Sequence, residues 1–300
     1  MAGPRQTIDS PSFTPLPYGL LSVVENPTPA DTHWENGVTY TSRCVTGMGA
    51  ITWDECITVT GTGGPPPAPP TKTGNVSTTH RGAIPFTPVV EFDCSPVGNE
   101  DALTVAQRAL AQAEPFQVER AFWTGQAIPG GPSLIFPHLA ADANIVDAQG
   151  ILLQTIPITG GPFDAAEGLG FLEAQLGSCY GGRGVIHVPS FALPTLVAWN
   201  LVTVSGPTLK TAKGNLVAVG DGYPGTSPAG SAPSAGQSWI YATGAVFAYR
   251  SQVAVNSLRE SLDRSENTVK MIAERTYVLG YECCYIGALI ELGVPGPVAP

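Results

Sequence analysis

Charged side chains are scarce in this sequence of 300 residues. Asp, Glu, Lys and Arg make up 13% of it, whereas an ordinary soluble domain carries about 25%. A compact monomer of 31.1 kDa exposes about 12,000 Å², so each charge would have to cover roughly twice the usual area. We therefore expect either an unusually apolar surface or a surface that is shared with another molecule.

Other absences exclude whole classes of protein. No apolar run reaches the roughly 18 residues of a membrane helix, so no membrane partner is expected. The first residues, MAGPRQTIDSPSF, lack the basic and apolar regions of a signal peptide. The 14 basic and 24 acidic residues give a net charge of −10, which leaves no basic surface for nucleic-acid binding. The 35 glycines and 29 prolines follow no collagen period.

Motifs that carry chemistry are absent as well. The sequence has no G-x-S-x-G, G-x-G-x-x-G or Walker A motif, and its histidines form no H-x-x-x-H pair. We therefore assign no catalytic, cofactor-binding or metal-binding residue, and we predict that the chain is not an enzyme and needs no cofactor. His187 lies in an apolar strand-like run, so we expect a hydrogen-bonded core histidine.

Two polar clusters leave alternatives open. Trp34-Glu35 and Trp53-Asp54-Glu55 place acids beside aromatic rings, as a carbohydrate site would, but neither has a second matched acid pair. We expect surface turns there, and a carbohydrate-active enzyme remains the alternative. The densest charges form either a solvated face or inter-subunit ion pairs; they are Glu260, Asp263, Arg264, Glu266, Glu274 and Arg275.

The six cysteines follow no C-x-x-C spacing. Cys283 and Cys284 are adjacent and are therefore poor disulfide partners for each other. We expect buried apolar thiols, with a Cys44–Cys56 disulfide and a metal site as alternatives. The sequence does not decide whether Cys44, Cys56 or Cys94 forms a disulfide.

Residues 1–98 favour extended structure and turns, with a Pro-rich spacer at 61–70. A long helix is predicted over about 100–124, with Asn99 as its N-cap and an apolar face that includes Leu103, Ala106 and Leu110. Pro115 should kink or restart this helix.

Asp164 and Glu167 have the spacing of a helix N-terminus, and Gly181-Gly182 ends that second helix. A buried strand at 184–188 and a third helix over about 191–203 follow. Further strands are predicted at 216–219, 238–249 (broken at Gly244), 267–281 and 286–292. The fold class is therefore α+β.

This order of elements from Asn99 onward resembles the major capsid protein of tailed bacteriophages, the Hong Kong 97-type fold that encapsulin shells also use. The resemblance covers about two-thirds of the chain and rests on order and pattern, because the fold has no invariant motif. The segments that carry it are Leu169–Leu176, Gly184–Ser190, Leu193–Leu201, Leu216–Val219, Trp239–Val246, the strand with Glu274-Arg275, and Ala288–Leu292.

The resemblance implies a division of the chain into domains. Residues 99–160 and 240–282 would form a peripheral domain with a long spine helix, and residues 161–239 and 283–300 an axial domain. Residues 63–98 would form a Pro-rich extended loop. Residues 1–62 would be an N-terminal arm or a small β elaboration, and they depart in detail from a typical arm.

The function that the resemblance implies is a structural one. The chain would assemble into hexameric and pentameric capsomers of an icosahedral phage shell around double-stranded DNA, in the host bacterial cytoplasm, and would end in the virion. Its partners would be many copies of itself, with a decoration protein, a scaffolding protein, a portal and weak, sequence-independent contacts to DNA. The alternatives are a decoration or tail-tube protein and an encapsulin-like compartment.

Two finer expectations follow from the same resemblance. Some members of the family join subunits by a Lys–Asn bond; Lys72 alone lies in a suitable loop, and we expect no cross-link. The charge-poor segments 61–90 and 221–249 should lie against neighbouring subunits.

Overall fold

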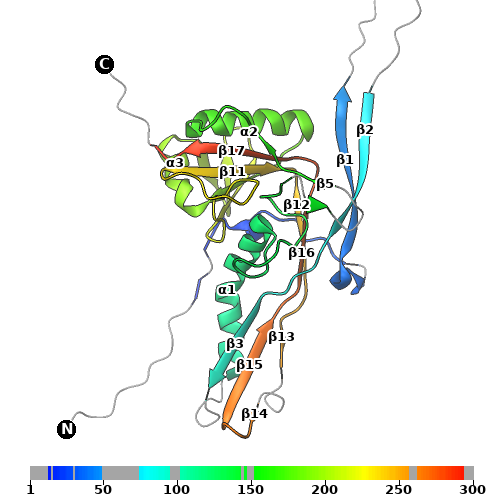
Figure 1. The fold of residues 1–300 in the computed structure, drawn as a ribbon, viewed down its shortest axis with the longest axis vertical. Coiled ribbons are helices and arrows are strands. Elements are labelled where there is room, and N and C mark those ends of the chain that lie inside the picture. The colour runs from blue at the N-terminus through cyan, green and yellow to red at the C-terminus, as the bar shows by residue number, and fades with distance from the viewer. Residues whose placement is uncertain are drawn as a thin grey trace, which may run out of the picture.

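The computed structural model describes residues 13–14, 16–29, 31–48, 74–94, 102–142, 145–146, 152–256 and 262–293. It has the mixed α+β composition that the sequence predicts. Three parts are distinct in Figure 1: a seven-stranded sheet with its helices, a stalk of one long helix and several strands, and a two-stranded β-ribbon beside them. No helix among these residues is long and apolar enough to cross a membrane.

The seven-stranded sheet is the largest element of the fold. It is closed on one face by the helices α2 (Ala165–Cys179) and α3 (Leu193–Ala198), and the end of α1 (Ala102–Thr124) packs against the other face. In spatial order its strands are β6 (Ile156–Pro157), β17 (Tyr285–Glu291), β11 (Gln237–Thr243), β7 (Val185–Pro189), β10 (Leu216–Gly220), β9 (Thr208–Thr211) and β8 (Val202–Ser205).

Helix α2 forms where the sequence predicts it. The Asp164 carboxylate accepts a hydrogen bond from the backbone N–H of Glu167 at 2.7 Å, which caps the first turn. Leu169, Leu172 and Leu176 are buried against the sheet, and the helix gives way at Tyr180 to Gly181 in the left-handed region, at φ 72°. The predicted strands at 184–188, 216–219 and 286–292 are present as β7, β10 and β17.

Helix α1 continues through Pro115, so the expected restart at this residue is wrong. Its first half packs Ala102, Ala106 and Leu110 on the stalk strands, and its second half buries Phe122 under the sheet. Packing on both sides of the proline therefore maintains the helix despite the lost hydrogen bond. Leu103, expected on the apolar face, is 43% exposed, and Asn99 lies outside the described residues.

The stalk consists of α1 together with four strands. These are β3 (Val89–Cys94), β13 (Ala254–Val255), β14 (Leu262–Asp263) and β15 (Thr268–Glu274). Two further strands, β12 (Val246–Arg250) and β16 (Tyr277–Tyr281), form a pair that links the stalk to the sheet (Figure 1). The single strand predicted over 267–281 is therefore divided, because β15 and β16 join different sheets.

The third helix is shorter than predicted. It ends at Ala198, and Asn200 adopts a left-handed conformation with φ 54°. The N–H of Leu201 then bonds back to the carbonyl of Leu196 at 2.9 Å, which closes the helix end and releases the chain into β8. The predicted extension to residue 203 is wrong because this turn comes first.

The β-ribbon consists of β1 (Val38–Met48) and β2 (Gly74–Ala83), paired antiparallel with Val38 opposite Ala83. Short elements complete the described chain: two 3-10 turns at Leu20–Ser22 and His33–Asn36 with a third at Ser190–Ala192, and the paired strands β4 (Ile145–Val146) and β5 (Leu152–Leu153).

The strand β11 in the charge-poor segment 221–249 is buried within its own chain. Ile240, Tyr241 and Ala242 on β11 are at most 1% exposed, in the middle of the seven-stranded sheet. Intramolecular packing therefore explains much of the missing charge there, and the expectation that this whole segment faces a neighbour is wrong for β11. Residues 61–73 of the other charge-poor segment lie outside the described residues.

Candidate functional site

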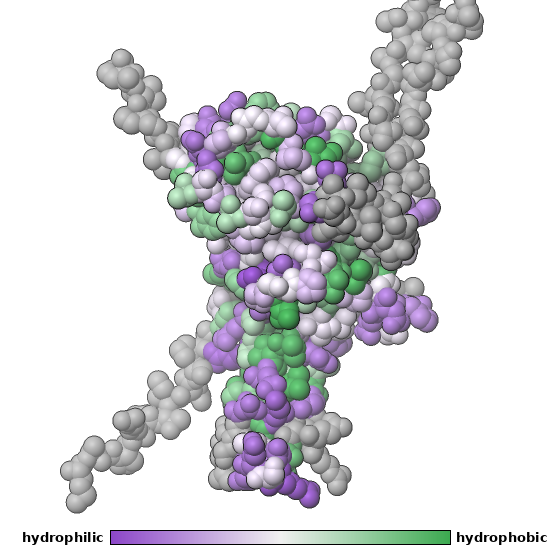
Figure 2. All heavy atoms as spheres, viewed as in Figure 1, coloured by the Kyte–Doolittle hydropathy of each residue, from purple (hydrophilic) through white to green (hydrophobic). Residues whose placement is uncertain are grey.

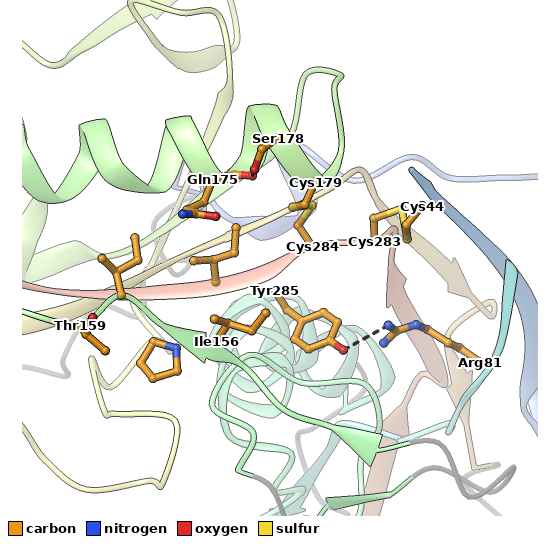
Figure 3. A pocket seen from close by; sticks show the side chains of 13 residues that line it. Cys44, Arg81, Ile156, Thr159, Gln175, Ser178, Cys179, Cys283, Cys284 and Tyr285 are labelled. Carbon is orange, nitrogen blue, oxygen red and sulfur yellow. Dashed lines mark hydrogen bonds between the residues drawn. A yellow bond between two sulfur atoms is a disulfide. The ribbon is translucent and has the colours of Figure 1, made fainter. Parts of the chain in front are cut away.

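Two disulfides connect the β-ribbon, the sheet and α2 at one place, which we call the ribbon junction. Cys44 on β1 is bonded to Cys283, with Cα atoms 5.4 Å apart, and Cys179 at the end of α2 is bonded to Cys284, with Cα atoms 6.0 Å apart. The adjacent cysteines thus bond to two different elements (Figure 3). The connection between β16 and β17 is thereby attached both to the ribbon and to the helix.

These bonds correct the expectation of free thiols for four of the six cysteines. They also exclude a Cys44–Cys56 disulfide in this structure, because Cys44 is bonded to Cys283. The partners are 239 and 105 residues apart, so no local spacing in the sequence signals them. Cys56 lies outside the described residues, and among the described residues no cluster of His, Cys, Asp or Glu could hold a metal ion.

Arg81 on β2 is the charged residue of the ribbon junction. Its side chain is buried, with 6% of the residue exposed. The Nη2 atom donates a hydrogen bond to the Tyr285 hydroxyl at 3.3 Å, and the guanidinium carbon lies 4.9 Å from the centre of the Tyr285 ring. The Nε and Nη1 atoms are buried and have no hydrogen-bond partner. The alternation of the strand alone does not single out Arg81, because its burial depends on contacts with β17.

A cavity of about 620 Å³ adjoins this arginine. Its wall is mostly apolar, with Ile156 and Ile286 among its members, and Arg81 is its charged lining residue. Figure 3 shows the cavity between the end of α2, the β6 segment and the ribbon, with Arg81 and Tyr285 on one side. The neutral polar residues that line it are Tyr285, Thr159, Gln175 and Ser178. The site offers binding chemistry: one cation beside an apolar wall.

His187 lies in the centre of the sheet, and both of its ring nitrogens have hydrogen-bond partners. The His187 ring nitrogens contact the hydroxyls of Tyr223 at 3.2 Å and Thr243 at 3.0 Å. Burial lowers the pKa of His187 to about 3, so the ring is neutral at physiological pH. The expectation of a hydrogen-bonded core histidine is confirmed.

Glu119 on α1 connects three distant segments. Its carboxylate accepts hydrogen bonds from the N–H groups of Leu20 and Gly222, each at 3.1 Å. Burial raises the pKa of Glu119 to about 7, against the lowering effect of these bonds. Glu119 thereby holds the N-terminal 3-10 turn and the 221–223 loop against the helix.

The dense charges at 260–275 divide between surface and interior. Arg275 forms an ion pair within the chain, with Nη1 3.2 Å from each Glu114 oxygen, and the Tyr277 hydroxyl also donates to Glu114. Arg275 therefore belongs neither to a solvated face nor to an inter-subunit ion pair, so both expectations are wrong for this residue. Asp263, Arg264 and Glu266 are exposed, and Glu260 lies outside the described residues.

The acid–aromatic pairs do not form a carbohydrate site among the described residues. Trp34 is buried and stacks on Tyr249 at 5.7 Å between ring centres, while Glu35 is exposed. Trp53, Glu55 and Lys72 lie outside the described residues.

Comparison with known proteins defines the class of fold. No family model and no curated protein matches the sequence. Solved structures do match over nearly the whole chain, and they show the fold of phage capsid proteins. The predicted resemblance is thus confirmed at the level of fold.

Three of these structures can be named. A chain of Microbacterium phage Oxtober96 has a TM-score of 0.51 and 15% identity, with 96% of this chain and 95% of that chain covered. A chain of Mycobacterium phage Adephagia has the same TM-score and identity, with 96% and 93% covered. A chain of the capsid of an empty GTA particle has a TM-score of 0.52 and 12% identity, with 97% and 94% covered.

Proposed function

We propose that this chain is the major structural protein of a phage shell. Copies assemble into hexameric and pentameric capsomers, and these tile an icosahedral capsid around double-stranded DNA. The observation that carries the proposal is the fold, which covers 97% of this chain when matched to a chain of the GTA capsid. The virion is then the final location, and assembly takes place in the host cytoplasm.

Apolar side chains on the stalk support burial against neighbouring copies. Val89 on β3 is 57% exposed, and α1 exposes Leu103 and Phe116 at more than 40% each. Figure 2 shows apolar surface on the stalk with hydrophilic residues around it. Exposed apolar groups that gather on one part of a surface favour a protein–protein contact.

The domain assignment follows the same proposal. The stalk belongs to a peripheral domain (residues 99–160 and 240–282) with α1 as its spine, and the seven-stranded sheet belongs to an axial domain (161–239 and 283–300). Because the sheet includes β6 from Ile156 and continues in β11 to Thr243, we move the two boundaries to Ile156 and Gly244. Residues 1–62 serve as an arm and 63–98 as an extended loop, with β1 and β2 as the paired bases of the ribbon.

The further partners are a scaffolding protein, a portal and a decoration protein, with weak, sequence-independent contacts to the packaged DNA. The net charge of −10 favours weak contact, because acidic surfaces repel nucleic acid. The 23-residue helix α1 weighs against a tail-tube protein, which is built mostly from strands.

Sedimentation velocity of the purified full-length protein tests the proposal. We expect capsomers or shells that co-purify with DNA or assemble from subunits on concentration. A cargo enzyme in the particle would instead indicate an encapsulin-like compartment. A stable monomer at every salt and protein concentration tested would overturn the proposal.

A further inference from the structure

The positive charge of Arg81 has no acidic partner among the described residues. Ion pairs among the described residues include His33–Asp31, Lys270–Glu91 and Arg275–Glu114, and none of these contains Arg81. Arg81 has instead one long hydrogen bond to a neutral hydroxyl and a contact with an aromatic ring. A buried charge without a counter-charge is strongly unfavourable, so the single chain leaves this site incomplete.

The cavity beside Arg81 indicates what would complete it. An apolar wall with one cation fits a side chain that carries a carboxylate on a short apolar stem, and it does not fit a nucleic-acid backbone, which requires several cations. The mouth of the cavity also carries an apolar group that a neighbour would cover: Ile156, on the edge strand β6, is 63% exposed.

We propose that this cavity receives an acidic side chain from a second copy of the chain, whose carboxylate pairs with Arg81. The inference rests on the proposed self-assembly. Charge complementarity favours a second copy as the occupant, because the chain has 24 acidic and 14 basic residues. Arg81 lines the cavity, and its Nε and Nη1 atoms have no hydrogen-bond partner in the single chain.

The two disulfides of the ribbon junction hold the walls of the cavity in place. The Cys44–Cys283 bond fixes the ribbon that carries Arg81, and the Cys179–Cys284 bond fixes the helix end on the opposite wall of the cavity. Docking of a neighbour therefore occurs against walls that are covalently attached to each other. A receptor held in this way loses little conformational entropy on binding.

The test compares the assembly of Arg81→Met with that of wild type. The control is Arg183→Met, which removes an exposed arginine outside the cavity. We expect Arg81→Met to raise the protein concentration required for assembly by at least about tenfold, while the control leaves it unchanged. Thermal unfolding of the unassembled subunit separates docking from folding, because loss of an unpaired buried charge should leave its melting temperature equal or higher.

Two substitutions of opposite charge at the cavity mouth provide a second test if Arg81→Met does not fold. Ile156→Glu and Ile156→Lys change the same exposed side chain by opposite charges. An incoming carboxylate is repelled by the first and attracted by the second, so assembly should weaken with Glu and persist with Lys.

The outcomes separate this inference from the proposed function. Wild-type assembly at the same concentration by folded Arg81→Met, or equal effects of Glu and Lys at position 156, would overturn the inference alone. Failure of the wild type to assemble would overturn the proposed function and, with it, the second copy as occupant.

Discussion

The centre of the seven-stranded sheet and the ribbon junction both bury a basic side chain, and they differ in how it is satisfied. His187 contacts two hydroxyls from its own chain and stays neutral, because burial lowers its pKa. Arg81 keeps its charge and leaves two nitrogens without a partner. The first region is complete in a single chain, and the second is not.

Under the proposed function, this difference separates the interactions that fold one subunit from those that join subunits. The sheet, its helices and the end of α1 form continuous apolar cores that a monomer can build alone. The junction lies where the ribbon leaves those cores and where a cavity remains open. A subunit that folds before it assembles needs the first kind of region, and specific assembly needs the second.

The largest effect that we expect is a loss of folding stability at acid pH, caused by the burial of neutral His187. Its folded pKa of about 3 is below the ordinary 6.5, so the unfolded state binds more protons and stability falls as the pH drops through this range. Relative to His187→Gln, the wild type should lose up to about 5 kcal/mol between pH 6.5 and pH 3. Urea unfolding at several pH values measures this, with the exposed His80→Gln as control. Parallel curves for wild type and His187→Gln would contradict it.

A matched pair of substitutions on α1 tests the packing of this helix under the seven-stranded sheet. Phe122 is 0% exposed beneath the sheet, and Phe116 on the same helix is 42% exposed. Phe122→Ala should cost about 3–5 kcal/mol of unfolding free energy, and Phe116→Ala less than about 1 kcal/mol. Phe116→Ala should instead weaken assembly, if the exposed apolar surface of the stalk is an interface. Equal losses of stability would show that the helix does not pack as described.

Removal of each disulfide tests how the ribbon junction is held together. Cys44→Ser with Cys283→Ser should cost about 2–4 kcal/mol and speed hydrogen exchange in β1 and β2. The matched pair Cys179→Ser with Cys284→Ser should affect the end of α2 and leave the ribbon protected. Alkylation followed by mass spectrometry should show all four thiols blocked until a reductant is added. Immediate labelling of all four would contradict the pairing.

A smaller effect of opposite sign is expected at Glu119. Its folded pKa of about 7 lies above the ordinary 4.5, so the unfolded state ionises first and stability falls as the pH rises from 4.5 to 7. Glu119→Gln has no such loss. Its free energy of unfolding, relative to that of the wild type, should therefore increase by about 2 kcal/mol between pH 4.5 and pH 6. Denaturant unfolding of both proteins measures the difference. A gain that decreases with pH would contradict it.

The elements that the sequence predicts well are those with local signals. Helix α2 has its cap at Asp164 and its glycine end at Gly181, and β7 is a short apolar run that ends at Pro189. Their order was enough to indicate the capsid fold. In these segments, local conformational preference and tertiary packing agree.

The features that the sequence does not predict depend on contacts between distant residues. Helix α1 crosses Pro115 because both of its halves are packed, and Arg275 is half-buried because it pairs with Glu114 on another element. The disulfide partner of Cys44 is 239 residues away. The burial of Arg81 likewise depends on Tyr285, so the candidate site could not be predicted from spacing or composition.

Negative-stain imaging of the purified wild-type protein tests self-assembly most directly. We expect closed shells, or hexameric and pentameric rings of a chain that is folded before it assembles. Fields that contain only separate subunits, at high protein concentration and across a range of salt and pH, would contradict it.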